Sequence, residues 1–284
     1  MKFQYILDKI QAAKMASKPF SHLQIDHFLS QPHLKMIQED RQVHFLEMST
    51  DEKVVAELLS SGYRVQSFPG CTNDPNDYLA RLKSNVWPHE HLGNPIGSYG
   101  ITFRLQEYKS DNIRELIEFL SGLEFHNTLR DKFNIQEKTE ILTAIQKNLS
   151  KYEICPHPDI RTKALTYLLN INKDARSEKI DIHTHLLKFK KKYEYIYNIW
   201  ETRTDIERCW VPWNWCKTID IVNKNNTIVI FAPSNDTLHA VKLDYDHRDF
   251  QRTQIYGNLN YSERERLPFQ EGKYQALKKD LLVR

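Results

Sequence analysis

The sequence has few cysteines, and they are placed without order. No two of them form a CxxC pair, and their spacing is irregular; they are Cys71, Cys155, Cys209 and Cys216. The pattern therefore indicates neither a zinc knuckle nor a disulfide framework. We expect reduced thiols, as in a cytoplasmic protein.

The sequence also lacks a long hydrophobic run and a strong excess of one charge. No segment approaches the roughly 18 apolar residues of a membrane-spanning helix. Residues 1–16 carry Asp8 and Lys9 where a signal peptide needs an unbroken apolar stretch. The net charge of +3, from 40 basic and 37 acidic residues, is too small to indicate a nucleic-acid or membrane partner. We expect a soluble, cytoplasmic protein that binds neither.

What is present is an ordinary globular composition, with 40% hydrophobic and 27% charged residues in a chain of 284. The first half has mainly helical patterns. Apolar residues recur at helical spacing in 1–16, 51–59 and 112–133. A short strand is expected within 19–29, and 63–108 is rich in the prolines and glycines of turns.

From about residue 138 the pattern changes to short apolar runs rich in Ile, Val, Thr, Tyr and Phe, separated by turns. Such spacing is typical of an antiparallel sandwich or barrel. The runs are 139–146, 152–155, 164–171, 182–189, 217–222, 227–232, 237–243 and 252–259. The sequence therefore predicts an α+β protein, with a helical first half packed against an all-β second half.

Two histidines and an aspartate in the β-rich half are candidate metal ligands. His157 and Asp159 lie two residues apart at the end of a run, and side chains at i and i+2 leave the same face of an extended chain. His239 follows in a later segment of strand character. Two histidines and one carboxylate on one side of an ion form the facial triad of non-heme Fe(II) oxygenases. His157 and Asp159 alone would equally suit a surface turn. The segments that follow them in the sequence therefore decide between a turn and a metal site.

Arg252 begins an otherwise uncharged run of alternating type and shares a face with Gln254 and Tyr256. An inward-facing arginine requires an anionic partner, because burying the charge unpaired is costly. A guanidinium can bind a carboxylate through two hydrogen bonds, which suits a small dicarboxylic acid. A salt bridge to a neighbouring strand is the alternative.

The order of these segments resembles the Fe(II)- and 2-oxoglutarate-dependent oxygenases, over about residues 140–260. The resemblance rests on a "pHpD…K…T.l.YlN" segment, an "NT.viFaPs..TlHaV" segment and an "RtqiyGnL" strand. This sequence supplies them as Pro156-His157-Pro158-Asp159 with Lys163 and 166–170, then 226–241, then 252–259.

The resemblance implies a double-stranded β-helix core and a hydroxylase that uses Fe(II), 2-oxoglutarate and dioxygen. In this family the iron ligands would be His157, Asp159 and His239. Arg252 would bind the distal carboxylate of 2-oxoglutarate, with Lys163, Thr184 and Gln254 also in the cosubstrate site. The carboxylate of Asp159 disfavours halogenation, because the family's halogenases have Gly or Ala there. A rival HxH pair, His183 and His185, is interpreted as flanking side chains.

We expect a single domain over 1–284, with a mainly helical part (1–137), a jelly-roll core (138–262) and a C-terminal tail (263–284). The long interval between Asp159 and His239 is assigned to an insertion, 188–216. Alternating tyrosines from Tyr193 predict a strand or hairpin there, and Trp210-Val211-Pro212-Trp213-Asn214-Trp215 predicts an aromatic loop. These aromatics would either pack the loop onto the sheet or line the substrate pocket as a lid.

Several alternatives stay open at the level of sequence. Zinc would also accept two histidines and a carboxylate, so a zinc hydrolase or isomerase, or a simple binding module, is the second hypothesis. An oxygenase acting on protein or nucleic acid is the third, and we favour a small-molecule substrate over it. Pro88-His89-Glu90-His91 is interpreted as surface, and Gly93, Gly97 and Gly100 as a turn. The oligomeric state is open, a homodimer included.

Overall fold

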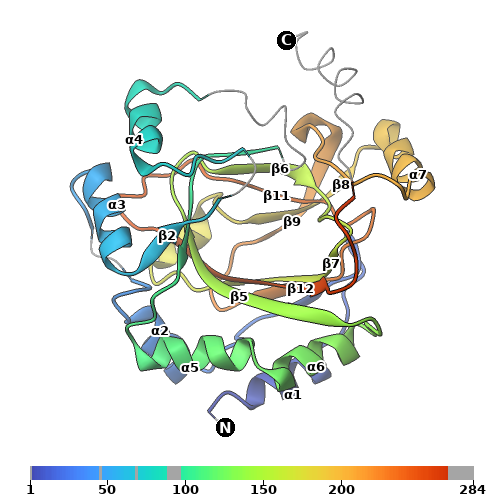
Figure 1. Cartoon of the computed structure of the whole chain (residues 1–284), viewed down its shortest axis with the longest axis horizontal. Helices are drawn as coiled ribbons and strands as arrows, with labels where there is room; N and C mark the ends of the chain where they lie inside the picture. The colour runs from blue at the N-terminus through green and yellow to red at the C-terminus, as the bar shows by residue number, and fades with distance from the viewer. Residues whose placement is uncertain (1, 45–46, 68–69, 88–96, 268–284) are drawn as a thin grey trace.

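Two antiparallel β-sheets face each other, and helices cover the outer side of the larger one (Figure 1). The computed structural model describes residues 2–44, 47–67, 70–87 and 97–267. In the described part the larger sheet has the order β1 (Leu23–Ile25), β10 (Ile228–Phe231), β7 (Lys163–Asn170), β12 (Arg252–Tyr261), β5 (Thr139–Asn148), β4 (Thr102–Leu105) and β2 (Tyr63–Val65). The smaller sheet has the order β3 (Ser98–Tyr99), β6 (Glu153–His157), β11 (His239–Lys242), β8 (Thr184–Phe189) and β9 (Cys216–Val222).

The helices precede most of the strands in the chain. They are α1 (Tyr5–Ala12), α2 (Gln31–Gln38), α3 (Asp51–Ser60), α4 (Pro75–Ser84), α5 (Asp111–Leu120), α6 (Leu123–Lys132) and α7 (Tyr195–Thr202), with short 3₁₀ turns at Ala175–Lys179, Lys191–Tyr193 and Trp213–Trp215. Figure 1 shows α1, α5 and α6 side by side below β5 and β12. Among the described helices none is long and apolar enough to cross a membrane.

Successive side chains of a strand in the larger sheet point to opposite faces, and one of these faces is apolar. On β12, Ile255 and Leu259 join the main core with helix residues such as Leu116. The side chains between them in the sequence point the opposite way, and Gln254 is paired in register with Gln146 of β5. The larger sheet thus packs apolar side chains against the helices. Towards the smaller sheet it turns polar side chains together with an apolar cluster that joins Leu168 and Phe231 to Leu186 of β8.

Gly257 is required by close packing within the larger sheet. Tyr167 lies opposite it on β7, and a Cβ added at Gly257 would lie 2.0 Å from the Tyr167 Cζ atom. The Tyr167 hydroxyl is 2.5 Å from Thr143 Oγ1 on β5. The tyrosine therefore crosses β12 at the one point where that strand has no side chain.

These observations confirm the α+β class and the double-stranded β-helix core. Each apolar run predicted after residue 138 is a strand, and the helices predicted in 1–16, 51–59 and 112–133 are present. The short strand predicted within 19–29 is β1, but the first 137 residues are less purely helical than expected, since they also supply β2 and β4 to the larger sheet and β3 to the smaller. The N-terminal part therefore shares both sheets with the rest of the chain.

The predicted strand or hairpin in the insertion was wrong. Residues Tyr195–Thr202 form helix α7. Its buried residues, Ile196 and Trp200, are four apart and therefore lie on one helical face. They pack in a cluster with Phe189 and Leu238. The burial of Ile196 and Trp200 therefore favours a helix, although the tyrosines at every second residue had indicated a strand.

Candidate metal centre

Two neighbouring strands of the smaller sheet bring the predicted ligands together. His157, the last residue of β6, is paired in register with His239, the first residue of β11. Their ring centroids are 4.5 Å apart, and Asp159 follows just beyond the end of β6. One ligand atom from each of the three side chains lies within 4.8 Å of the other two. All three residues are buried.

Backbone carbonyls orient both imidazoles. His157 Nδ1 lies 2.8 Å from the carbonyl oxygen of Cys155, and His239 Nδ1 lies 3.1 Å from that of Thr237. A carbonyl accepts only, so each Nδ1 carries the proton and each Nε2 keeps a free lone pair. This arrangement is typical of metal-binding histidines, whose second nitrogen is fixed by an outer partner.

The electrostatic surroundings keep all three side chains in the form that binds a metal. Burial lowers the pKa of His157 to about 3, and it also lowers the pKa of His239. Burial alone would raise the pKa of Asp159, but Lys163, His239 and His157 together outweigh it, with Lys163 the strongest of the three, and the pKa is lowered. Two neutral imidazoles and one carboxylate are therefore ready at neutral pH.

Both oxygens of Asp159 accept hydrogen bonds from β7. Lys163 Nζ lies 2.5 Å from Oδ1, and Thr166 Oγ1 lies 2.6 Å from Oδ2. Lys163 also donates to the Tyr256 hydroxyl at 3.2 Å. Burial would lower the pKa of Lys163, but Asp159 more than compensates and the pKa is raised. Lys163 thus stays charged and fixes the carboxylate.

All seven residues predicted for the site line one cavity of about 540 Å³ between the sheets; they are His157, Asp159, Lys163, Thr184, His239, Arg252 and Gln254. The amide of Gln254 donates to Asn170 Oδ1 at 2.7 Å. Thr184 stands at the start of β8. The metal ligands and the other predicted residues therefore share one internal space.

Arg252 has no anionic partner in the described part of the chain. It is 2% exposed, and its Nη1 donates to Asn148 Oδ1 at 2.6 Å. Its Nε is buried without a hydrogen-bond partner. Burial lowers the pKa of the guanidinium to about 10, so it remains charged at neutral pH. A buried cation of this kind requires an anion to offset its desolvation.

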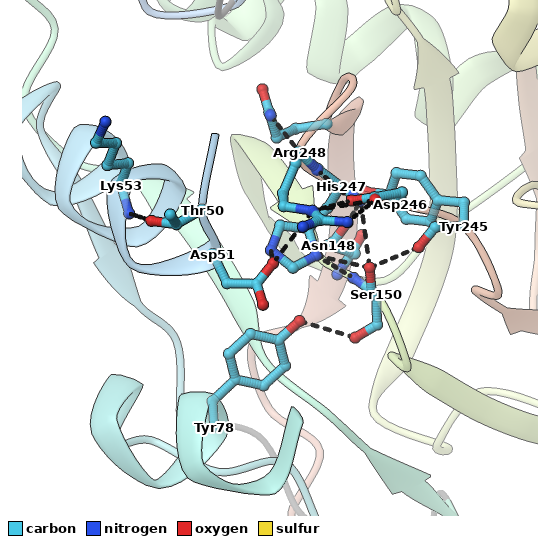
Figure 2. A network of polar contacts seen from close by, with 11 residues as sticks. Thr50, Asp51, Lys53, Tyr78, Asn148, Ser150, Tyr245, Asp246, His247 and Arg248 are labelled. Carbon is cyan, nitrogen blue, oxygen red and sulfur yellow. Dashed lines mark hydrogen bonds and ion pairs between the residues drawn. The ribbon is translucent and has the colours of Figure 1, made fainter. Parts of the chain in front are cut away.

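A polar network behind Arg252 fixes the loop that leads into β12 (Figure 2). The Tyr245 hydroxyl accepts from the backbone N–H of Arg252 at 3.0 Å and donates to the carbonyl of Asn148 at 2.7 Å. Ser150 Oγ is 2.6 Å from His247 Nδ1, and His247 Nε2 is 3.4 Å from an Asp51 oxygen on α3. The N-terminal helix α3 is thereby connected to the strand that carries Arg252.

The rival histidines have other partners. His183 Nε2 donates to the carbonyl of Ser177 at 2.6 Å. His185 contacts Asp181 at 2.7 Å through Nε2 and Thr218 at 3.0 Å through Nδ1. Neither belongs to the described group of three metal ligands. The segment 88–91 and Gly93 lie outside the described residues.

The insertion supplies an arginine to the cavity, which sequence reasoning missed. Of the described insertion residues, only Arg208 lines the cavity. The aromatics Trp200 and Trp215 pack together with Val211 in their own cluster against β8 and β11, so they hold the insertion onto the sheet. One signal was available, namely a charge immediately before the apolar segment that begins at Cys209.

No protein-family model and no curated protein matches the chain. A prolyl-4-hydroxylase structure from Pseudomonas putida is 9% identical with a TM-score of 0.42, covering 90% of this chain and 97% of that chain. A prolyl hydroxylase from Trichoplax adhaerens, in complex with a hypoxia inducible factor peptide fragment, is 11% identical with a TM-score of 0.42, covering 96% and 90%. The epimerase SnoN, in complex with Fe³⁺ and alpha ketoglutarate, is 9% identical with a TM-score of 0.40, covering 94% and 86%. These values are too low to support an inference about function, which must come from the side chains themselves.

Proposed function

We propose that the protein is a non-heme Fe(II)- and 2-oxoglutarate-dependent dioxygenase that hydroxylates an unactivated C–H bond of a small molecule. The observation that carries the proposal is the pairing of two elements in one cavity. One is the buried group of His157, Asp159 and His239, and the other is Arg252, a buried arginine without an anionic partner among the described residues. The first suits a divalent metal and the second suits the far carboxylate of a dicarboxylic acid.

Each residue then has a definite task. The Nε2 atoms of His157 and His239 and a carboxylate oxygen of Asp159 would hold the metal on one side, which leaves the opposite side open. Arg252 would bind the distal carboxylate of 2-oxoglutarate, with Gln254 and Thr184 along the same cavity. Fe(II) bound there would supply dioxygen activation coupled to decarboxylation of 2-oxoglutarate to succinate. The polar residues around the group of ligands keep them oriented without adding a further metal ligand.

Lys163 fits a supporting role better than a cosubstrate contact. Its ammonium is already paired with Asp159 and the Tyr256 hydroxyl. We therefore assign it to positioning the carboxylate ligand and leave the cosubstrate to Arg252.

Binding of metal and cosubstrate tests the proposal. Anaerobic protein with Fe(II) and 2-oxoglutarate is expected to develop a visible charge-transfer band. His239→Ala should abolish metal binding, and Arg252→Gln should weaken 2-oxoglutarate binding on the order of 100-fold while metal binding persists, because about 3 kcal/mol of charged hydrogen bonding is lost. Arg176→Gln serves as the control, since Arg176 is an exposed arginine paired with Asp174. Full cosubstrate affinity in Arg252→Gln, or no band in metal-loaded protein, would contradict the assignment.

A zinc hydrolase or isomerase remains the second candidate, because the same three ligands accept Zn²⁺. Succinate formation from 2-oxoglutarate in the presence of Fe(II) separates the two, since the zinc enzyme would form none. Location in the cytoplasm and the absence of nucleic-acid and membrane partners stay predictions, and the oligomeric state, a homodimer included, stays open.

A further inference from the structure

The cavity that holds the candidate metal ligands is strongly cationic. Five of its described lining residues carry a positive charge, namely Arg104, Lys163, Arg208, Arg252 and Arg266, and Asp159 is the one carboxylate among them. Bound Fe(II) and the 2-oxoglutarate dianion would cancel each other, so they would leave this excess in place. Like charges gathered around one space raise the local concentration of anions. In the proposed function Arg252 binds the cosubstrate and Lys163 positions the carboxylate of Asp159. Neither role explains why Arg208 also lies in the cavity.

Arg208 is a buried cation without a described counter-ion. The residue is 4% exposed, and its Nε is buried without a hydrogen-bond partner. No carboxylate of the described residues lies within 4.0 Å of its guanidinium. Burial lowers its pKa to about 10, and repulsion from Arg161 adds to the effect. The side chain is therefore charged, desolvated and free to donate, an arrangement that is costly unless a ligand offsets it.

The local structure holds Arg208 in place while leaving its guanidinium free. Its neighbour Glu207 turns inward, where Oε1 accepts from the backbone N–H groups of Arg161 at 2.9 Å and Arg208 at 3.0 Å. The backbone N–H of Val211 donates to the carbonyl of Pro156 at 2.7 Å. These contacts fasten the insertion to the chain beside His157. Glu207 thus anchors the backbone through Oε1 and forms no ion pair with the Arg208 guanidinium, although its charge partly offsets that of the arginine.

Arg208 and Arg252 stand in different surroundings within the same cavity. Burial and repulsion from Arg161 lower the pKa of Arg208. The carboxylates that raise it are those of Glu207, Asp159 and Asp236. Burial lowers the pKa of Arg252, and Tyr152 and Tyr245 raise it by a smaller amount. Both arginines line the cavity that also contains Asp159, and Arg252 is joined through its backbone N–H to the polar network at the start of β12. Two anionic groups would thus have separate cationic partners in one cavity.

We infer, on the premise of the proposed function, that the primary substrate is a small molecule with an anionic oxygen group, a carboxylate or a phosphate, which Arg208 binds. A guanidinium offers two parallel N–H donors that match either group. The apolar side chains of Ile160 and Leu168 line the same cavity and suit a hydrocarbon part. Anchoring the anion at Arg208 places the rest of the molecule next to the metal ligands. Arg208 is thus a specificity-determining residue.

Anion binding to the full-length protein tests this inference. The protein is loaded without oxygen with Mn(II), as a redox-stable substitute, and with saturating 2-oxoglutarate, so that Arg252 is occupied. Inorganic phosphate and acetate are titrated separately, and their nuclear magnetic relaxation is measured. We expect saturable paramagnetic relaxation of at least one anion, and the two arms distinguish a phosphate from a carboxylate ligand. Arg208→Gln should weaken that binding about tenfold or more, which corresponds to one charged hydrogen bond.

Two further variants make the result specific. Arg203→Gln is the matched control, because Arg203 is a half-buried arginine of the same insertion, paired with Asp205 and outside the cavity lining. The anion affinity of this variant should equal that of the wild type. Arg208→Lys should retain part of the affinity. Arg208→Gln should unfold at an equal or higher temperature than the wild type, because it removes an unpaired buried charge. A lowered unfolding temperature with unchanged anion binding would show a purely structural role and overturn the inference.

The inference and the proposed function can fail separately. Mn(II) and 2-oxoglutarate affinities are measured in the same samples, and their failure counts against the proposed function alone. In that case the anion site is tested by calorimetric titration of phosphate and acetate into the metal-free wild type and the metal-free Arg208→Gln variant. Saturable binding that survives Arg208→Gln, as for phosphate bound directly to the metal, would overturn the inference. So would the absence of saturable binding of both anions to the wild type.

Discussion

At the scale of single residues, the ionisation of Asp159 depends on its neighbours. Its carboxylate is buried, and burial favours the protonated form. Lys163, in contact at 2.5 Å, is the strongest of the groups that together reverse this preference. A proton and a metal ion compete for the same oxygen atoms. Lys163 would therefore protect metal binding at this site against acid.

Replacing Lys163 should make metal binding sensitive to pH. In the wild type the lowered pKa of Asp159 keeps the carboxylate ionised throughout the mildly acidic range. In Lys163→Met the acid loss of Mn(II) affinity should begin about one pH unit or more higher, the usual effect of an opposite charge at this distance. Titration of Mn(II) affinity against pH measures this. Lys242→Met is the control, because Lys242 lies on β11 and contacts Glu153 at 3.6 Å.

The same comparison separates the two interpretations of Lys163. If Lys163 mainly positions Asp159, 2-oxoglutarate affinity at neutral pH should change little in Lys163→Met. A large loss of cosubstrate affinity with unshifted metal titration would instead support the cosubstrate contact expected from sequence.

At the scale of elements, strand β12 has a sharp steric requirement. A Cβ at Gly257 would lie 2.0 Å from the Tyr167 Cζ atom, much closer than two carbons can approach. Gly257→Ala must therefore displace either the tyrosine or the strand. We expect a loss of about 1–3 kcal/mol in the free energy of unfolding, measured by urea denaturation.

A double-mutant cycle identifies the cause of that loss. Tyr167→Leu removes the ring that the new methyl group would meet. In the Tyr167→Leu background, Gly257→Ala should cost clearly less than in the wild type, because contacting residues do not act additively. Equal costs in both backgrounds would mean that strand backbone effects, and not the ring, explain the glycine.

Elements also show what the sequence could and could not predict. The strands after residue 138 were predictable because their buried, β-branched faces repeat every two residues. Helix α7 was misinterpreted because tyrosines at alternate positions coincide with a buried pair, Ile196 and Trp200, four residues apart. The sequence order suggested His157 and His239 as partners, but only the pairing of β6 with β11 makes them neighbours. The charge immediately before Cys209 marked Arg208 in the sequence, but its place in the cavity depends on how the insertion folds back, which that local signal does not encode.

At the scale of the whole molecule, stability should fall in acid. Burial lowers the pKa of His183 to about 4 from an ordinary value of 6.5, and it lowers the pKa values of His157, His239 and His247 as well. Below about pH 6.5 the unfolded chain takes up protons that the folded chain does not. The free energy of unfolding should therefore decrease progressively as the pH falls from 6.5 towards 4.

His183→Gln tests this prediction away from the candidate ligands. Glutamine can still donate to the carbonyl of Ser177 but does not titrate. A pKa lowered from 6.5 to about 4 corresponds to about 3 kcal/mol at pH 4, and the variant should lose that much less stability than the wild type between pH 7 and pH 4. Urea unfolding across this range measures the slope. His27→Asn, at an exposed position with φ of 52°, should leave it unchanged.

The pairing of His157 with His239 also has a topological consequence. The two residues are neighbours on adjacent strands, yet the chain between them includes β7, β8, the insertion, β9 and β10. An ion held by both would close this long segment into a ring, as a reversible cross-link does, and closing long loops restricts the unfolded chain most. Chelation would then be equivalent to cutting that link, and it should speed the release of the segment under force or protease attack.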